Sequence, residues 1–153
     1  TYKAKYPWLS GVDTTFDEAH GGMKRDLDYR GDPLELNGKR YEHGILLCPV
    51  GVTKIGVAEF DLTTLPKARG LKAVIGIEDM TGRNGSCEFI VEGRVAGKWR
   101  QLYKSPRLRG GDKAIPITVK FPEGMTELRL KTTDGGDNAN SDHALWADAK
   151  FIE

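Results

Sequence analysis

The chain has 153 residues, which is enough for one domain whose core needs no disulfide or metal to hold it together. It carries 23 Lys and Arg against 22 Asp and Glu, and the two signs are interspersed, so the charge argues against nucleic acid or an anionic membrane as a partner. No stretch approaches the roughly 20 apolar residues of a membrane span. We expect a single domain over residues 1–153 and, in the absence of a signal-peptide pattern, a module of a longer protein.

Short strands separated by glycine-rich turns recur along the chain after an irregular lead-in. Asn37-Gly38, inside Pro33–Leu47, predicts a tight hairpin, because a type I′ turn needs positive φ at both central residues. Leu71–Ile77 is almost wholly apolar and predicts a central strand that is buried on both faces. The other predicted strands are Val52–Leu62, Ser86–Gly93, Lys98–Ser105, Ala114–Phe121, Glu127–Thr133 and Ala144–Ile152.

The last predicted strand alternates, which places Leu145, Ala147, Ala149 and Phe151 on one face and Trp146 on the other. We nevertheless expect Trp146 to be structural, because its neighbours are typical of a core. Apart from one short turn within Leu62–Gly70, no window has the period of an amphipathic helix. Many short strands with glycine-rich turns indicate an all-β, antiparallel sandwich or barrel.

Enzyme signatures are missing from the sequence. It has no Gly-x-Ser-x-Gly, His-Glu-x-x-His or Cys-x-x-Cys motif and no phosphate-binding glycine loop. Asp134, Asp137 and Asp142 could supply an acid/base pair, but nothing in the sequence fixes their separation. Cys48 and Cys87 could be bridged or could be two buried thiols.

Two loops are rich in oxygen donors and leave two interpretations open. The loop from Asp134 to Asp142 could hold a hard cation such as calcium, or could be a glycine turn with solvated side chains. The same alternatives apply to Arg25–Pro33, which contains Asp26, Asp28 and Asp32.

Aromatic residues raise the possibility of a sugar site. A sugar ring binds to an aromatic face while planar polar side chains contact its hydroxyl groups. Trp99 stands near a predicted hairpin tip, where it could be such a platform or a core residue.

Five segments then occur in a familiar order: PLELNGKRYEHGI, VIGIED, GSCEFIVEG, LRLKTTDGGDN and SDHALWADAKF. From about Trp8 to Phe151 the chain resembles the NPCBM family, also called carbohydrate-binding module family 51. The resemblance implies a jelly-roll β-sandwich of the galactose-binding-like kind, which is not an enzyme itself and binds galactose-containing glycans. It further implies a tether to a larger secreted carbohydrate-active enzyme of bacterial type, such as a glycoside hydrolase, an extracellular or periplasmic location, and a structural calcium ion.

The resemblance also implies roles for particular residues. Together with the aromatic platform considered above, it leads us to expect as ligand-binding residues Glu42, His43, Glu78, Trp99, Asp142 and His143. The expected calcium ligands are Asp26, Asp28 and Asp148, and no catalytic residue is expected.

One position departs from the family pattern. The family's Gly-Ile-Gly-Thr-His-Ala stretch falls on residues 44–49, so that Cys48 stands where the family has histidine. This departure motivates an alternative hypothesis, a structural or protein–protein interaction sandwich that has lost its sugar site.

Overall fold

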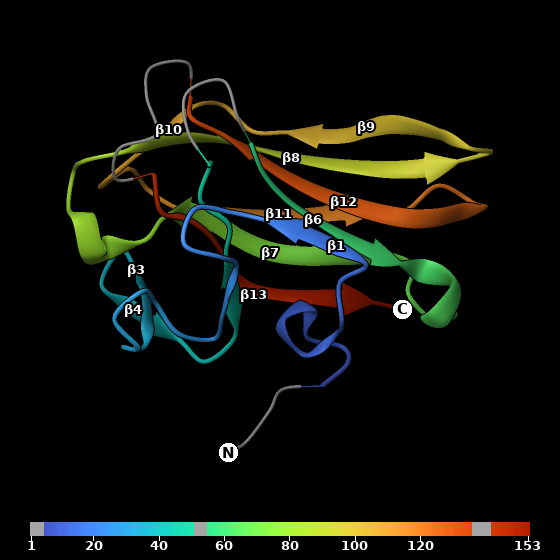
Figure 1. Ribbon diagram of the computed structural model, residues 1–153, viewed down its shortest axis with the longest axis horizontal. Coiled ribbons are helices and arrows are strands. Elements are labelled where there is room, and N and C mark those ends of the chain that lie inside the picture. The colour runs from blue at the N-terminus through green and yellow to red at the C-terminus, as the bar shows by residue number, and fades with distance from the viewer. Residues whose placement is uncertain (1–4, 51–54, 136–141) are drawn as a thin grey trace.

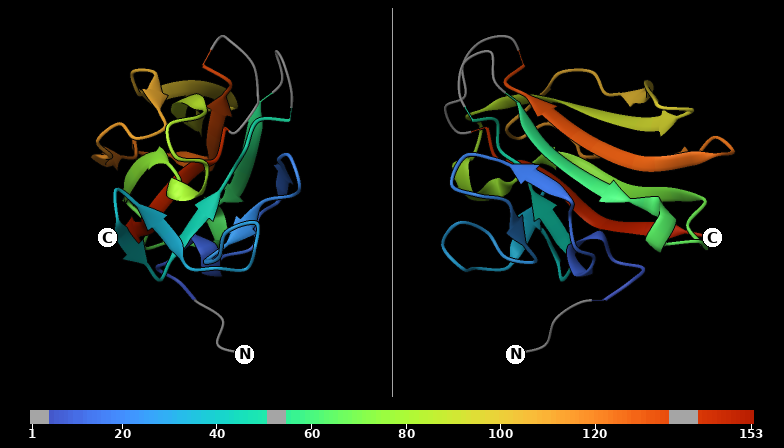
Figure 2. Two further views of the ribbon diagram at one scale, coloured as in Figure 1. Left: turned by 90° about the vertical axis from the view of Figure 1, so that its left-hand side faces the viewer. Right: turned by 45° about the vertical axis from the view of Figure 1, so that its right-hand side comes forward.

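The computed structural model describes residues 5–50, 55–135 and 142–153, which form two antiparallel sheets packed face to face (Figures 1 and 2). The first sheet has the order β1 (Phe16–Glu18), β6 (Gly56–Asp61), β12 (Met125–Thr133), β8 (Ser86–Val95) and β10 (Leu108–Arg109), with β9 (Lys98–Lys104) also paired to β8. The second sheet has the order β11 (Ile115–Lys120), β7 (Gly70–Ile77), β13 (Ala144–Ile152), β5 (Gly44–Leu46) and β2 (Lys24–Arg25).

The connections between strands give the sandwich its topology. From β5 onward the chain crosses from one sheet to the other at every connection except those from β8 through β10. This alternation defines an antiparallel jelly roll, which confirms the predicted fold class. Short 3₁₀ turns occur at η1 (Leu9–Gly11), η2 (Leu62–Thr64) and η3 (Asp79–Thr81), and η2 is the turn predicted within Leu62–Gly70.

The main core lies between the two sheets. Trp146 is fully buried there, with its ring 5.3 Å from that of Phe89 in an edge-on arrangement, which confirms the structural role expected for this tryptophan. Phe60 and Phe151 form a second edge-on pair at 6.0 Å. Fully burying each such side chain stabilises the fold by about 1.5–3 kcal/mol.

A hairpin adds a third layer on the outer face of the second sheet. Its strands are β3 (Leu34–Leu36) and β4 (Lys39–Tyr41), joined by the predicted Asn37-Gly38 turn, in which φ is 53° and 79°. Leu34, Leu36 and Tyr41 form a small core with Leu46, Leu145 and Ala147 of the sheet. The hairpin therefore covers the second face of the central strands, and most of β7 is buried on both sides, as predicted.

Strand β13 corrects one expectation. A bulge between Ala147 and Lys150 shifts the register, and Asp148 at this bulge has φ of 48°. Before the bulge, Leu145 and Ala147 face the hairpin while Trp146 faces the main core; after it, Ala149 and Phe151 face the main core. The prediction that these four residues share one face was wrong because the bulge reverses the alternation.

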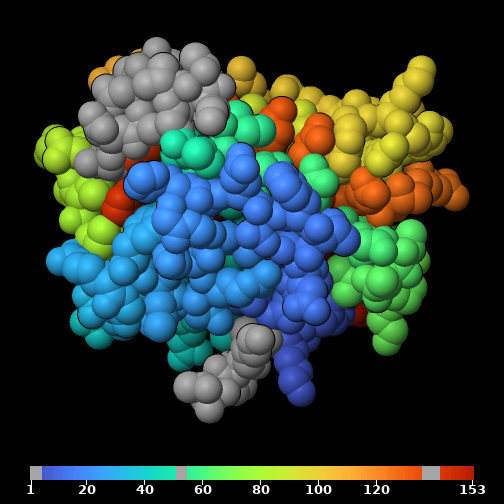
Figure 3. All heavy atoms as spheres, in the orientation of Figure 1, coloured from blue at the N-terminus to red at the C-terminus, as the bar shows by residue number. Residues whose placement is uncertain are grey.

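The segment that precedes β3 wraps an edge of the sandwich and fills much of the face visible in Figure 3. Phe151 donates a backbone hydrogen bond to the carbonyl of Pro7 (2.7 Å), and the Arg25 guanidinium donates to the carbonyls of Leu9, Ser10 and Val12. The short strands β1, β2 and β10 were not expected from the sequence. In the described part of the chain, no helix is long and apolar enough to cross a membrane.

Candidate functional site

Two adjacent carboxylates at the end of β7 hold the hairpin in place. Glu78 is 2% exposed and accepts hydrogen bonds from the backbone N–H groups of Glu35 (3.0 Å) and Met80 (2.9 Å). Asp79 accepts from the backbone N–H groups of Asn37 (2.9 Å) and Gly38 (2.7 Å) at the hairpin tip. We call these two residues the carboxylate clamp.

Asn37 extends the connection to a third segment. Its side-chain amide donates to the carbonyl of Asp112 (3.0 Å), and its amide oxygen accepts from the backbone N–H of Ala114 (2.7 Å). The hairpin tip is thus tied to the loop after β7 and to the loop before β11. Figure 2 (left) looks onto this end of the sandwich.

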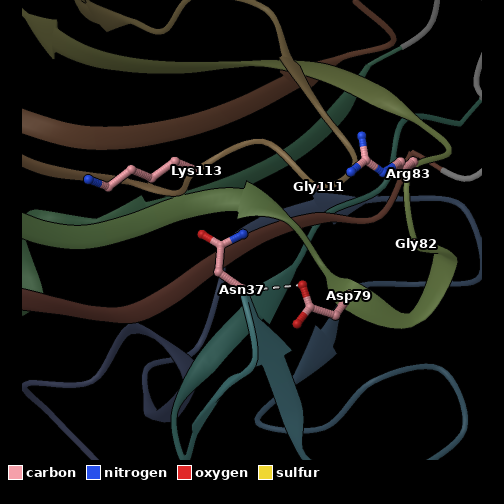
Figure 4. Close-up of a pocket in the computed structure, with 6 residues that line it drawn as sticks. All are labelled: Asn37, Asp79, Gly82, Arg83, Gly111 and Lys113. Carbon is pink, nitrogen blue, oxygen red and sulfur yellow. Dashed lines mark hydrogen bonds between the residues drawn. The ribbon is translucent and has the colours of Figure 1, made fainter.

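Three hollows surround the hairpin. The basic hollow (≈ 640 Å³) is lined by Asn37, Asp79, Gly82, Arg83, Gly111 and Lys113, and Figure 4 shows Arg83 and Lys113 on opposite sides of the Asn37–Asp79 contact. The acidic hollow (≈ 380 Å³) is lined by Asp28, Arg30, Asp32, Pro33, Glu35, Arg40, Glu78, Asp79 and Met80. The edge hollow (≈ 910 Å³) is lined by Ser10, Arg25, Asp26, Leu27, Pro33, Arg40, Tyr41, Glu42 and His43.

The hollows adjoin one another around the hairpin. Asp79 borders the basic and acidic hollows, whereas Pro33 and Arg40 border the acidic and edge hollows. A ligand longer than one sugar ring could therefore follow the hairpin from one hollow into the next.

The edge hollow offers the chemistry that a sugar ring requires. Leu27 is 46% exposed and, with the exposed Pro33, provides apolar surface for the C–H groups of the ring. The Arg40 side chain is 76% exposed and lies 3.8 Å from Glu35. Glu42 is exposed and has no side-chain partner within the described residues, so its carboxylate remains available to a hydroxyl group.

His43, the second predicted ligand residue in the edge hollow, is mostly buried. Its ring packs on that of Trp8 at 4.3 Å, and its Nδ1 lies 3.5 Å from the Asp26 carboxylate. The predicted ligand residues Glu42 and His43 therefore both line the edge hollow, although His43 mainly forms its floor.

Glu78, Asp142 and His143 lie at the loop end but have structural contacts. Glu78 belongs to the clamp, and burial raises the pKa of its carboxyl group above the usual value. Asp142 is 1% exposed and accepts from the backbone N–H of Ser86 (2.7 Å). The His143 carbonyl accepts from the backbone N–H of Glu78 (2.9 Å). These contacts order the loops beside the hollows.

The interpretation of the Asp134–Asp142 loop as an acid/base site gains no support from its described ends. Both Asp134 and Asp142 are buried, and the Asp134 carbonyl accepts from the Ser86 hydroxyl (3.2 Å). Gly135 has φ of 73° and lies in a turn, whereas Gly136 and Asp137 lie outside the described residues.

Trp99 is separated from the other predicted ligand residues. It pairs with Arg94 near the far end of β8, roughly 26 Å along the strand from Ser86, which lies at the loop end (Figure 1). Its ring stacks under the Arg129 guanidinium at 3.9 Å, and Arg129 also bonds to Glu92 (2.7 Å). Trp99 thus belongs to a charged network on the outer face of the first sheet.

The three predicted calcium ligands are not assembled into a set. Asp28 accepts from the backbone N–H groups of Arg30 (2.8 Å) and Asp32 (2.9 Å) within its own loop. Asp26 and Asp148 lie on opposite sides of β5, where Asp26 accepts from the Gly44 N–H (3.1 Å) and Asp148 donates its N–H to the His43 carbonyl (2.8 Å). Among the described residues, no group of three His, Cys, Asp or Glu side chains is placed to hold a metal ion.

The cysteine that replaces the family's histidine is an interior residue. Cys48 is 4% exposed, borders none of the three hollows, and burial raises the pKa of its thiol to about 11. Tyr29 lies beside it, and burial likewise raises the pKa of the Tyr29 hydroxyl. In the described part of the chain, Cys48 and Cys87 are not bridged.

Sequence reasoning missed Arg40, Arg83 and Lys113 and the structural role of Asn37. The Asn-Gly pair and the adjacent Glu78 and Asp79 were visible in the sequence, but only as a turn and as a strand end. Arg83 and Lys113 had no signal, because their loops meet only in the folded chain.

This architecture is that of a β-sandwich binding module, with hollows at its loops and with carboxylates committed to backbone N–H groups. The sequence pattern described as the NPCBM/NEW2 domain matches residues 5–152, and the chain belongs to this family, as predicted.

Similar proteins extend the comparison. A protein of Renibacterium salmoninarum named "Putative endo-alpha-N-acetylgalactosaminidase" is 28% identical over 99% of this chain, which spans only 9% of that protein. The structure of CBM51 from Clostridium perfringens GH95 in complex with methyl-galactose has a TM-score of 0.79 and 22% identity, covering 95% of this chain and 98% of that one. The tandem CBM51 modules of Sp3GH98 from Streptococcus pneumoniae have a TM-score of 0.78 and 19% identity, covering 95% and 46%.

The carboxylate clamp can be tested by Asp79→Asn. The new amide nitrogen is a donor and would face a backbone N–H of Asn37 or Gly38, so one hydrogen bond to a charged carboxylate is lost. We expect the free energy of unfolding in urea to fall by about 1–3 kcal/mol. Asp32→Asn, an exposed aspartate of the same region, is the control, with an expected change below about 0.5 kcal/mol. Equal changes in the two variants would contradict the clamp.

His143 gives a pH-dependent prediction. Burial lowers its pKa from 6.5, against an opposing effect of Asp28, so the unfolded chain takes up a proton at higher pH than the folded chain does. The stability that His143 contributes is therefore complete above pH 6.5 and is lost as the pH falls through this value toward the lower, folded pKa. We expect the melting temperature of His143→Asn to fall less than that of the wild type between about pH 7.5 and 5.5. His20→Asn should change the slope less than His143→Asn does, because the charge of His20 is a smaller cause of the lowered His143 pKa than burial is. An unchanged slope in His143→Asn would refute the assignment.

Proposed function

We propose that the chain is a non-catalytic carbohydrate-binding module that recognises galactose-type glycans and tethers a larger carbohydrate-active enzyme to them. The observation that carries this proposal is the edge hollow, where apolar surface lies beside an uncommitted carboxylate, Glu42, and an exposed guanidinium, Arg40. Membership of the family and a related fold solved with methyl-galactose support the class of ligand.

The contacts of the carboxylates at the loop end support a binding role over a catalytic one. Glu78 and Asp79 each accept two backbone N–H groups, and Asp142 accepts one. A general acid or base must exchange a proton with a bound substrate, whereas these carboxylates are committed to holding loops.

The location and the parent protein belong to the same proposal. A module for galactose-type glycans acts where such glycans are displayed, which places it in an extracellular or periplasmic setting. The much longer Renibacterium salmoninarum relative supports attachment to a glycoside hydrolase.

The alternative, an interaction sandwich without a sugar site, was motivated by Cys48. Because Cys48 is buried and borders none of the three hollows, the replacement of histidine by cysteine leaves their surfaces unaffected. This observation favours the sugar-binding proposal.

Binding of methyl galactoside, measured by calorimetry, tests the site. Glu42→Gln and Arg40→Ala should each weaken binding roughly tenfold, because each removes a charged hydrogen-bonding partner of the sugar. Trp99→Ala is the matched control and should leave affinity unchanged, since Trp99 pairs with the end of β8 that is remote from the loop end and its hollows. Loss of binding in Trp99→Ala alone would move the site to the first sheet, and absence of binding at millimolar sugar would overturn the proposal.

The binding of a structural calcium ion remains a prediction, and its three predicted ligands do not form a common site. Melting temperatures in calcium and in EDTA test it, because an ion that binds only the folded chain raises the melting temperature. A rise with calcium that Asp148→Asn abolishes would support the predicted ligands. A rise that this variant retains would place the ion elsewhere, and no rise would contradict a structural calcium.

A further inference from the structure

The basic hollow is framed by two loops that touch backbone to backbone. Gly110 donates its N–H to the carbonyl of Gly85 (3.0 Å). A side chain at Gly110 would lie 2.4 Å from the carbonyl oxygen of Asn84 and 2.5 Å from that of Gly82, so only glycine fits there. The same contact sets Arg83 beside Gly111, where an added Cβ would be 3.3 Å from the Arg83 Cγ.

The acidic and amide groups of this region are committed to the frame. Both oxygens of Asp79 accept backbone N–H groups of the hairpin tip, and Asp112 accepts the backbone N–H of Arg109 (2.8 Å). The Asn37 side chain uses its donor and its acceptor to hold the loop before β11. The groups that hold the hollow open have therefore little capacity left for a ligand.

The cations of the same loops are uncommitted. Arg83, Arg109 and Lys113 are exposed, and their side chains have no hydrogen bond or ion pair within residues 5–50, 55–135 and 142–153. This contrasts with Arg129, Lys131 and Lys104 on the outer face of the first sheet, each of which pairs with a glutamate. Figure 4 shows the Arg83 guanidinium directed across Gly111, whereas Lys113 extends outward from the opposite rim.

We propose that the basic hollow binds an anionic substituent of the glycan, a sulfate ester or a carboxylate, with Arg83 as the direct contact. A guanidinium can donate two parallel hydrogen bonds to such a group, and Lys113 adds attraction from the rim. The inference rests on the proposed sugar-binding function and extends it: the neutral part of the glycan occupies the adjoining hollows along the hairpin, and its acidic substituent reaches Arg83.

Calorimetry with three related oligosaccharides tests this inference. The probes are N-acetyllactosamine, its form sulfated on the terminal galactose, and its sialylated form. We expect at least one anionic probe to bind roughly 3- to 10-fold tighter than the neutral one at low salt, and the preference to shrink at about 0.5 M NaCl. Preference for the sulfated or for the sialylated probe identifies which oxyanion the hollow takes.

Variants separate a site from general charge attraction. Arg83→Ala, or Arg83→Gln if the first is unstable, should remove most of the preference, and Lys113→Ala should remove a smaller part. Arg100→Ala, which deletes an exposed cation on β9, should keep it.

The outcomes distinguish the two proposals. Equal affinity for neutral and anionic probes, or equal loss of preference in Arg100→Ala and Arg83→Ala, would overturn the basic hollow while sugar binding stands. Failure of all three probes to bind would overturn the sugar-binding function, and this inference with it.

Discussion

The loop end of this protein depends on one constraint, the capture of hairpin backbone N–H groups by Glu78 and Asp79. The clamp fixes the hairpin against the end of β7, and the hairpin in turn covers the outer face of the second sheet. Without this cover, Leu145 and Ala147 would be exposed, and the central strands would lose their second buried face. The hollows exist because a third layer is held on the sandwich at this point.

Acidic and basic side chains at the loop end have different roles. Carboxylates there accept backbone N–H groups and hold the loops, whereas Arg83, Arg109 and Lys113 face solvent without a hydrogen bond or ion pair in the described part of the chain. The outer face of the first sheet is different, since Arg129 there is neutralised by Glu59 and Glu92. A net charge near zero is thus compatible with a local group of unpaired cations, Arg83, Arg109 and Lys113, at the loop end.

The fold was largely predictable and the site only in part, for physical reasons. Alternation and the Asn-Gly turn are local signals, and they predicted the hairpin and the long strands. The bulge at Asp148 has no such signal, because an extra residue in a strand leaves composition unchanged while it reverses the faces. Trp99 was predicted from its residue type and its place near a hairpin tip, neither of which shows which end of the sandwich it occupies. Arg83 was missed because packing between segments far apart in the sequence decides which loops meet.

The Asn37-Gly38 turn has a consequence for the chemical ageing of the protein. Asn-Gly pairs deamidate when the glycine nitrogen attacks the asparagine side-chain carbonyl. Here the Gly38 N–H is held by Asp79, and both ends of the Asn37 amide are hydrogen-bonded, so the attacking geometry is blocked while the clamp is closed. The rate of deamidation at this turn therefore reports how often the hairpin tip opens in the native protein, long before any loss of secondary structure would reveal it.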